Sequence, residues 1–381
     1  MLSHHLAIAE HRRRLITFTA YRSSGLSSKS AETCPNEDRR TGGPILKRLA
    51  SELDSIDGLY GLGMDQNANE YSRPSLVGAA PLGVIDYVRD SVGSHFFREQ
   101  PAADGFTPSV ASIITTEDDR QVFVKAGPTT DAGGEAVRTG AELAQVVTDL
   151  GPALLSWAER DGWYVAIYER LAGAAIVEWQ REDIAGLATL SATMRERFDP
   201  SPLNGTEEYA DAFAPLLGAW SALKDPDGPA GHSVEHVRNQ EVPYGLRVET
   251  LAGLEEDWFV ALRGATSLQH GDLRRDNVMR EPSGRLRFVD WTHRWTAPNW
   301  ADWVRLVPDI SADGFDPEQL FQSLTGPETP EHEVNVMLAG LAGRCWRDGY
   351  LGAVPGLPQL RPMQRLQGDM ALRWLAQRGV H

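Results

Sequence analysis

The sequence contains very little cysteine, with only Cys34 and Cys345 among its 381 residues. Two cysteines so far apart form neither a disulfide framework nor a metal-binding pattern. Long apolar runs are also missing, since no stretch approaches the roughly 20 residues that a helix needs to span a bilayer. The apolar stretch at residues 15–20 is too short for a secretory signal, and no clear cleavage site follows it. We therefore expect a cytoplasmic protein that does not contact a membrane.

Basic charge is scarce as well, because the chain has a formal net charge of -16 at pH 7. Such a charge argues against nucleic acid or an anionic membrane surface as a partner. It is compatible with a cationic substrate, and equally with an ordinary acidic globular protein. Nothing in the sequence indicates a protein partner.

Apolar periodicity is missing from the beginning of the chain. Ser, Arg, Asn and Gly are frequent there, and the section from Ser23 to Gly43 shows almost no apolar repeat. Residues 1–75 are therefore expected to form a disordered or loosely attached extension, with one short helix at 44–56. The length of the chain allows two lobes or two to three domains, and its 41% hydrophobic and 24% charged residues are typical of a globular protein.

After this extension, short strands and helices alternate before helices become dominant. The first part predicts strands joined by tight turns, including a hairpin with an acidic turn at Glu117–Asp119. From Trp179 onwards the pattern is helical. The predicted strands are 111–115, 121–125, 153–157 and 163–168, and the predicted helices are 81–92, 135–147, 184–194, 209–223, 251–262, 333–346 and 362–378.

The most informative stretch of the sequence runs from His270 to Trp291. Asp272 and Asn277 lie in the pattern H-G-D-x-x-x-x-N, and a short strand, a Pro/Gly turn and a returning strand that ends at Asp290 follow. This order predicts a hairpin with Asn277 and Asp290 at its open ends. Two hard oxygen ligands side by side suit Mg²⁺, which takes one or two protein carboxylates together with phosphate oxygens. Such an arrangement is what phosphoryl transfer from a nucleotide requires.

This pattern, followed by an apolar-Val-Asp-Trp strand, resembles the aminoglycoside phosphotransferase family, the small-molecule branch of the protein-kinase-like fold. The resemblance covers about residues 80–381. It implies a two-lobe α+β fold, with a small antiparallel-sheet lobe that carries one helix at 76–170 and a larger, mainly helical lobe at 171–381. Protein kinases have Arg in place of Gly271 and Asp-Phe-Gly in place of 290–292, and no A-P-E segment is visible here, which argues against a protein substrate.

The resemblance also assigns roles in the larger lobe. It makes Asp272 the catalytic base, and Asn277 and Asp290 the metal ligands. His270 is expected to be structural and Asp302 to brace the catalytic loop. Arg274 and Arg275 either contact phosphate or face solvent, and the sequence leaves both alternatives open. The tryptophans that follow Asp290 are expected to pack beneath the hairpin.

In the smaller lobe, the resemblance makes Lys125 the strand lysine that contacts the nucleotide phosphates. A glutamate of the 135–147 helix is expected to pair with this lysine, and Glu142 is preferred over Glu135. The turn that begins at Gly105 corresponds to the nucleotide-covering loop. The hinge between the lobes is expected to bind the adenine edge through its main chain, and it comprises Tyr168, Glu169, Arg170 and Leu171.

The sequence therefore predicts an enzyme that uses Mg²⁺ and ATP or GTP to phosphorylate a hydroxyl of a small molecule. An aminoglycoside acceptor would make it an antibiotic-resistance enzyme. A kinase of another antibiotic or metabolite, such as choline, homoserine or a sugar, is the first alternative. A nucleotide-binding module without catalysis is the second, and the presence together of Lys125, Asp272, Asn277 and Asp290 argues against it.

Overall fold

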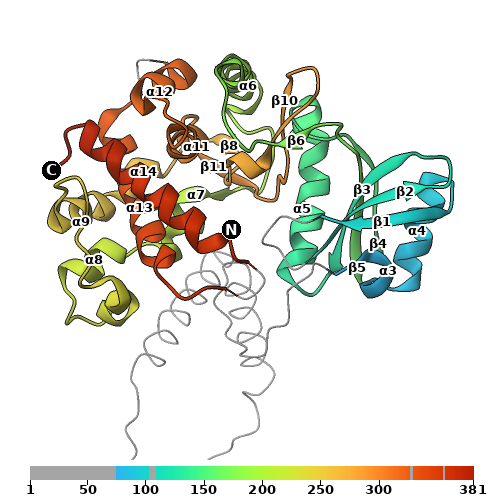
Figure 1. Cartoon of the computed structure of the whole chain (residues 1–381), viewed down its shortest axis with the longest axis horizontal. Coiled ribbons are helices and arrows are strands. Elements are labelled where there is room, and N and C mark those ends of the chain that lie inside the picture. The colour runs from blue at the N-terminus through green and yellow to red at the C-terminus, as the bar shows by residue number, and fades with distance from the viewer. Residues whose placement is uncertain (1–73, 103–108, 327–328, 355–356) are drawn as a thin grey trace, which may run out of the picture.

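The computed structural model describes residues 74–102, 109–326, 329–354 and 357–381. The predicted helix at 44–56 and the predicted extension up to residue 73 lie outside these residues, as does most of the nucleotide-covering loop from Gly105. The described chain forms two lobes that lie side by side, a sheet-containing lobe and a larger helical lobe (Figure 1). Among the helices of this described part, none is long and apolar enough to cross a membrane.

The smaller lobe is built on an antiparallel sheet of five strands in the order β1-β2-β3-β5-β4. Its strands are β1 (Phe96–Pro101), β2 (Val110–Thr116), β3 (Gln121–Pro128), β4 (Leu154–Arg160) and β5 (Trp163–Glu169). The sequence analysis missed β1, because this strand pairs with β2 alone and its mostly exposed residues give no apolar alternation. The other four strands were predicted, because each has alternating or consecutive apolar residues between turn residues.

Alternation along β3 decides which residues face the second lobe. Val122 and Val124 pack on one face of the sheet with the buried residues of α4 (Leu82–Val92), whereas Phe123 packs on the other face with α5 (Ala132–Val147). Lys125 therefore lies on the α5 face. It is not at the end of its strand, as predicted, but inside it, paired with residues of β2 and β5.

The smaller lobe carries more helix than the single one expected. The short α3 (Leu76–Ala79) and α4 cover the face of the sheet that points away from the second lobe, while α5 lies between the sheet and that lobe (Figure 1). The helix α4 agrees with the predicted 81–92 helix, and α5 begins slightly earlier than predicted. Asp131 caps α5, since its side chain accepts a hydrogen bond of 2.7 Å from the N–H of Gly134.

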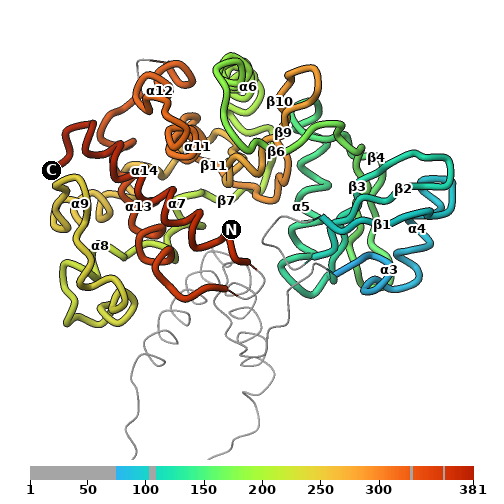
Figure 2. Tube along the Cα trace, in the orientation of Figure 1, coloured from blue at the N-terminus to red at the C-terminus, as the bar shows by residue number. Residues whose placement is uncertain are grey.

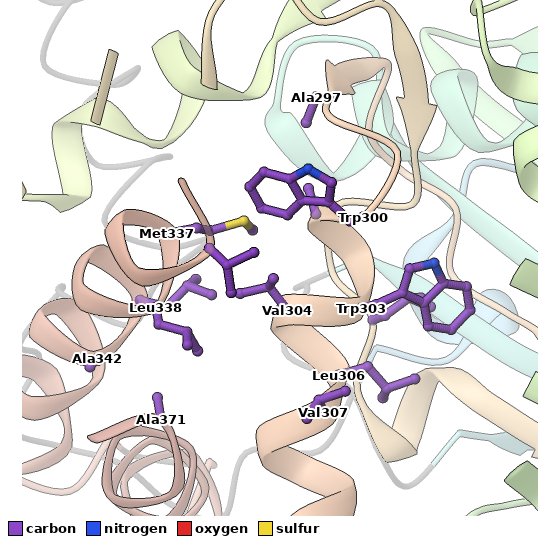
Figure 3. Close-up of a cluster of buried hydrophobic side chains, with 14 of the residues drawn as sticks. Ala297, Trp300, Trp303, Val304, Leu306, Val307, Met337, Leu338, Ala342 and Ala371 are labelled. Carbon is purple, nitrogen blue, oxygen red and sulfur yellow. The ribbon is translucent and has the colours of Figure 1, made fainter. Parts of the chain in front are cut away.

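The larger lobe is mainly helical (Figure 2). Its apolar core also includes Leu143, Val147 and Leu150 of the smaller lobe. Trp220, Trp258, Trp303 and Trp374 are fully buried in the molecule. Figure 3 shows part of this core, where Trp300, Val304 and Val307 face Met337 and Leu338 of a neighbouring helix. The main helices are α6 (Arg181–Phe198), α7 (Tyr209–Phe213), α8 (Ala219–Lys224), α9 (Val248–Glu256), α10 (Trp258–Leu262), α11 (Ala301–Ser311), α12 (Pro317–Thr325), α13 (Glu331–Gly349) and α14 (Leu360–Gln377).

Two predicted helices of this lobe are broken in the structure. The segment 209–223 forms α7, a short 3-10 turn and α8, because Pro215 interrupts the first helix and Gly218 adopts a φ of 91°. The segment 251–262 divides at Asp257 into α9 and α10. The sequence analysis also missed α11 and α12, which follow the catalytic hairpin.

The predicted hairpin is confirmed. Strands β9 (Val278–Arg280) and β10 (Leu286–Phe288) pair antiparallel, with Val278 opposite Phe288. On its outer side β9 pairs with β6 (Ala174–Ala175), which comes directly after the segment that leaves the smaller lobe. A second small sheet contains β7 (Glu207–Glu208), β11 (Trp295–Ala297) and β8 (Ser267–Gln269), and β8 leads into the H-G-D segment.

Candidate active site

A cavity of about 390 Å³ lies between the two lobes. This volume is in the range of small-molecule sites, and the wall is mostly apolar with a few polar groups, as such sites usually are. The predicted residues that line it are Lys125, Tyr168, Glu169, Arg170, Leu171, Asn277 and Asp290. The structure therefore brings together the strand lysine, the hinge and the open end of the hairpin, which are far apart in the sequence.

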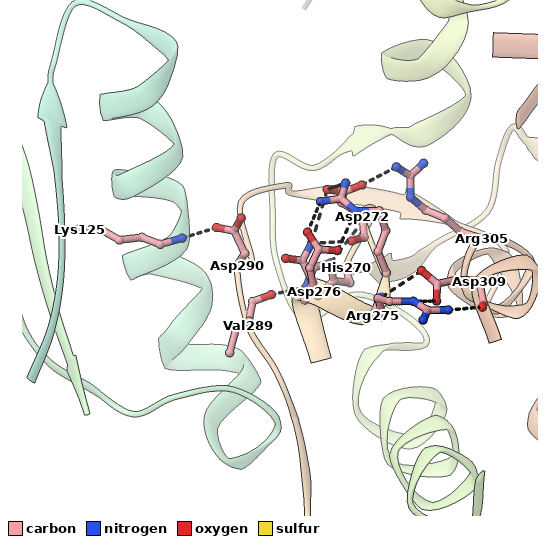
Figure 4. A network of polar contacts seen from close by, with 11 residues as sticks. Lys125, His270, Asp272, Arg275, Asp276, Val289, Asp290, Arg305 and Asp309 are labelled. Atoms are coloured by element: carbon pink, nitrogen blue, oxygen red, sulfur yellow. Dashed lines mark hydrogen bonds and ion pairs between the residues drawn. The ribbon is translucent and has the colours of Figure 1, made fainter. Parts of the chain in front are cut away.

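Asp272 lies in the larger lobe, beside the residues that line this cavity. Its Oδ1 forms an ion pair with Arg305, and its Oδ2 accepts a hydrogen bond of 2.6 Å from Arg274 (Figure 4). The amide of Asn277 donates to the main-chain oxygen of Asp272 over 2.8 Å. Burial opposes ionisation of this carboxyl, but the two guanidinium groups outweigh it and hold the pKa of Asp272 well below its usual range. The carboxyl group is therefore ionised at neutral pH, where it can accept a hydrogen bond from a hydroxyl group.

Side chains of α11 hold the loop that carries Asp272. The Asp302 carboxylate accepts hydrogen bonds from the main-chain N–H groups of His270 and Gly271, over 2.6 and 2.9 Å. The imidazole of His270 donates through Nε2 to the Val289 oxygen over 2.8 Å, which ties the loop to the end of β10. Gly271 has a φ of 80°, and a Cβ there would approach the ring of Trp295 to 2.6 Å, so only glycine fits.

The two arginines after Leu273 have different partners. Arg274 bridges Asp272 and Asp276, with its Nη2 2.8 Å from the Asp276 carboxylate. Arg275 turns the other way and binds Asp309 of α11, with an Nε to Oδ1 distance of 2.7 Å. Arg275 is therefore a structural residue that anchors the loop, whereas Arg274 belongs to the surroundings of Asp272.

Lys125 and Asp290 meet across the cavity. The Nζ of Lys125 forms an ion pair with Oδ1 of Asp290 (Figure 4). Burial opposes ionisation of Asp290, and the charge of Lys125 lowers its pKa. Asp290 has a φ of 65°, which is the left-handed conformation. This turn follows β10 and directs the carboxylate towards the smaller lobe, as Figure 4 shows.

The predicted pair between Lys125 and Glu142 is not formed. The Glu142 carboxylate binds Arg138 over 2.7 Å and Arg294 over 3.1 Å, and Glu135 also binds Arg138. The reason is the rotation of α5 about its axis. The cavity is lined by its small apolar stripe, including Val137, Gly140 and Ala144, and position 142 lies about 200° around the helix from position 140. Both glutamates therefore point away from Lys125.

Asn277 and Asp290 fit a magnesium–nucleotide complex better than a metal ion held by protein alone. Both line the cavity. The main-chain N–H of Val289, the residue before Asp290, donates a hydrogen bond of 2.9 Å to the main-chain oxygen of Asn277. Each offers an oxygen, which is the ligand type that Mg²⁺ prefers. No cluster of three or more His, Cys, Asp or Glu side chains that could hold a metal occurs within the described residues. Phosphate oxygens would have to supply the remaining ligands.

The hinge is fixed by side chains on both of its sides. The Glu169 carboxylate accepts hydrogen bonds of 2.8 Å from Arg287 of β10 and 2.9 Å from the N–H of Ala153, at the start of β4. Arg170 donates to the main-chain oxygen of Leu171. Tyr168 is buried against α5, and burial raises the pKa of its hydroxyl. The Glu169 and Tyr168 side chains thus support the hinge.

His293 was missed by the sequence analysis. Its ring stacks on Trp295 with a centroid distance of 3.7 Å and an angle of 7°. Burial lowers the pKa of His293 from 6.5 to about 4, although the charge of Asp272 opposes this shift. Nothing in the sequence distinguishes this histidine, because both its burial and its closeness to Asp272 arise from the fold.

We expect the imidazole of His293 to remain uncharged down to about pH 5 and to titrate near its pKa of about 4. Because the unfolded chain binds this proton at the ordinary pKa of 6.5, the group contributes stability above that pH, and the contribution is lost as pH falls towards about 4. Proton NMR of the imidazole resonances between pH 8 and 4 measures this, with His293→Gln to assign the signal. A midpoint near 6.5 would contradict the burial argument.

No protein-family model matches the chain, and neither does any curated protein. Among solved structures, it is similar to an aminoglycoside phosphotransferase from Alicyclobacillus acidocaldarius subsp. acidocaldarius DSM 446, with 13% identity, 84% of this chain and 98% of that chain covered, and a TM-score of 0.52. The fold is that of the aminoglycoside phosphotransferases.

A second structure with this fold is a thermostable mutant of aminoglycoside phosphotransferase APH(4)-Ia, in ternary complex with AMP-PNP and hygromycin B. It shares 13% identity with this chain, covers 76% of this chain and 97% of its own, and has a TM-score of 0.51. The predicted fold class is thereby confirmed, and the resemblance to aminoglycoside phosphotransferases is confirmed as a likeness of fold. At this identity the likeness carries no residue roles, so these depend on the site itself.

Proposed function

We propose that this protein is a small-molecule kinase, which transfers the terminal phosphoryl group of ATP or GTP to a hydroxyl of its acceptor. The observation that carries the proposal is the convergence of Lys125, Asn277 and Asp290 on one interlobe cavity, beside the buried carboxylate of Asp272. Phosphoryl transfer depends on positioning and charge neutralisation, and these groups offer both. A magnesium ion held by Asn277 and Asp290 would neutralise charge on the phosphates.

The hinge, Lys125 and Asp272 would each have a separate role in this reaction. The hinge from Tyr168 to Leu171 would bind the base of the nucleotide, and Lys125 would contact its phosphates. Asp272 would accept the proton of the acceptor hydroxyl while the hydroxyl oxygen forms a bond to the terminal phosphorus. The bond from that phosphorus to the bridging oxygen breaks, and the nucleoside diphosphate leaves. Asp272 is ionised and one quarter of its side chain is exposed, so a hydroxyl is able to reach it.

The acceptor need not be an aminoglycoside. Polycationic acceptors bind to carboxylates, and two carboxylates of the described residues near the hairpin and in α5, Asp276 and Glu142, are already bound by arginine. Another hydroxyl-bearing metabolite or antibiotic therefore stays an alternative acceptor. The second alternative, binding without catalysis, is opposed by the presence together of Lys125, Asp272, Asn277 and Asp290.

Turnover by the full chain tests the proposed function. We expect transfer of labelled phosphate from ATP or GTP, in the presence of Mg²⁺, to at least one member of a panel that pairs cationic with uncharged hydroxyl compounds. Nucleotide affinity, measured by calorimetry, should be present without any acceptor. A chain that binds nucleotide but phosphorylates nothing would favour the non-catalytic module. A chain that binds no nucleotide would exclude both.

A further inference from the structure

Helix α11 carries three charged residues that all turn towards the catalytic loop. Asp302, Arg305 and Asp309 are spaced so that they lie along one stripe of the helix. Asp302 binds the main chain at His270 and Gly271, and Asp309 binds Arg275, which lies further along the loop. Arg305 lies between these two contacts. Asp302 and Asp309 thus hold the loop at 270–271 and at 275, while Arg305 contacts Asp272, which lies between these points.

The partner of Arg305 is the Asp272 side chain itself. Its Nη2 donates to Oδ1 of Asp272, while Arg274 binds the second oxygen (Figure 4). With a guanidinium on each oxygen, the carboxylate is held in one orientation. Two oxygens together offer about four acceptor sites. Oδ2 also meets the Asn277 amide at 3.5 Å, so Oδ1 is the oxygen that keeps room for a further hydrogen bond. An acceptor hydroxyl could therefore bind Asp272 without displacing either arginine.

The position of Arg305 costs stability. Its side chain is only 10% exposed, and the neighbouring Val304 and Leu306 are fully buried. No hydrogen bond from its buried Nε has ordinary geometry among the described residues, although the buried Tyr209 hydroxyl interacts with the guanidinium group. Burying a guanidinium is expensive, and an apolar residue at such a position is often at least as stable. Packing therefore does not explain an arginine here, whereas its contact with Asp272 does.

We propose that Arg305 is a positioning residue, which holds the Asp272 carboxylate in the orientation that meets the acceptor hydroxyl. This inference rests on the proposed function, because it gives Arg305 a part in the same transfer. Arg305 would act through Asp272 and would touch neither nucleotide nor acceptor. Arg274 performs the complementary task on the other oxygen, but it belongs to the loop that it would orient. Arg305 connects Asp272 to the helical core.

The test uses Arg305→Met, which keeps the length and most of the volume of the side chain, together with Arg305→Lys. A misplaced catalytic group costs about 100-fold, so we expect kcat of the Met variant to fall by about that factor while ATP affinity stays within a few-fold. Lysine keeps a charge that can reach Asp272 and should restore part of kcat. Arg238→Met is the matched control, because Arg238 forms an exposed ion pair with Asp227, and it should leave kcat unchanged.

A double-mutant cycle separates positioning from a merely structural role. If Arg305 acts through Asp272, then Arg305→Met should cause no further loss of single-turnover rate in an Asp272→Asn background. An equal loss in both backgrounds would overturn the proposal. So would a Lys variant that is as slow as the Met variant although it folds normally.

Unfolding by urea adds a readout that does not depend on turnover. The same four proteins form a second cycle, in which Arg305 and Asp272 should be coupled in the free energy of unfolding. Removing Arg305 leaves Asp272 with Arg274 as its remaining guanidinium partner, and removing the Asp272 charge leaves the buried guanidinium of Arg305 without a counter-charge. Absence of this coupling would overturn the contact and the proposal with it. If the coupling is present but the wild type phosphorylates no acceptor, the proposed function is what has failed.

Discussion

Replacing Asp272 by asparagine is expected to lower kcat by about 100- to 10,000-fold, which is the usual contribution of a positioned base. Asparagine keeps the shape of the side chain but does not take up a proton at neutral pH. Wild-type Asp272 is ionised over the whole working pH range, because two guanidinium groups hold its pKa well below the usual one. The substitution therefore removes the base itself and leaves its place in the site occupied.

ATP affinity should stay within a few-fold in this variant. The groups proposed to bind the nucleotide line the interlobe cavity, and Asp272 is not one of them. The lost interaction would thus belong to the transition state and not to ground-state binding. Single-turnover phosphate transfer and calorimetric ATP titration measure the two quantities separately.

A matched control is needed because asparagine also weakens two arginine contacts. Asp313→Asn removes a carboxylate that is bound by Arg275 in the same lobe, at 3.4 Å, without touching Asp272. Its kcat should remain close to that of the wild type. If ATP binding of Asp272→Asn collapses together with its rate, Asp272 is structural, and the assignment as base is wrong.

The parts of the site that were predictable are those in which sequence neighbours become spatial neighbours. The H-G-D-x-x-x-x-N pattern and the hairpin after it span one short segment, so the turn at 281–284 was enough to place Asn277 and Asp290 at the same end. Lys125 was placed at the end of an apolar strand by the apolar run at 122–124 and the acidic turn before it. Its contact with Asp290 required the packing of two lobes, which no local pattern encodes.

The failure at Glu142 has a specific cause. The sequence analysis preferred Glu142 because more residues separate it from Lys125 than separate Glu135, which gives the loop room to turn. The rotation of α5, however, depends on which of its residues pack on the sheet. Val137, Ala141 and Ala144 share one apolar stripe, and they pack against Ala166 and Tyr168 of β5. The spacing of these three residues is visible in the sequence, and it places Glu135 and Glu142 on the opposite side of the helix.

Arg305 could not have been found in the same way. It lies in a helix that contains Pro308 and follows a tryptophan-rich segment. The sequence analysis interpreted the tryptophans as core and gave a role at the loop to Asp302 alone. A single arginine among apolar residues is equally consistent with a solvent-facing position. Only the approach of α11 to the catalytic loop gives the residue a partner.

The second large effect concerns Asp290, which should lose almost all turnover when it is replaced by asparagine. Asparagine is the suitable change because Asp290 has a φ of 65°, a conformation that asparagine tolerates and alanine does not. A metal ion contributes several kcal/mol of charge stabilisation in such reactions, so a loss of its carboxylate ligand should cost at least about 1,000-fold in rate.

Nucleotide binding distinguishes this variant from Asp272→Asn. In the wild type, Lys125 is paired with Asp290, and the substitution releases the ammonium group to attract phosphate. ATP without Mg²⁺ should therefore bind more tightly to Asp290→Asn than to the wild type, while the gain in affinity that Mg²⁺ gives should shrink. Asp272→Asn should keep that gain. Calorimetric titrations of ATP with and without Mg²⁺ on the three proteins measure both effects, and a full Mg²⁺ gain in Asp290→Asn would remove this residue from the metal site.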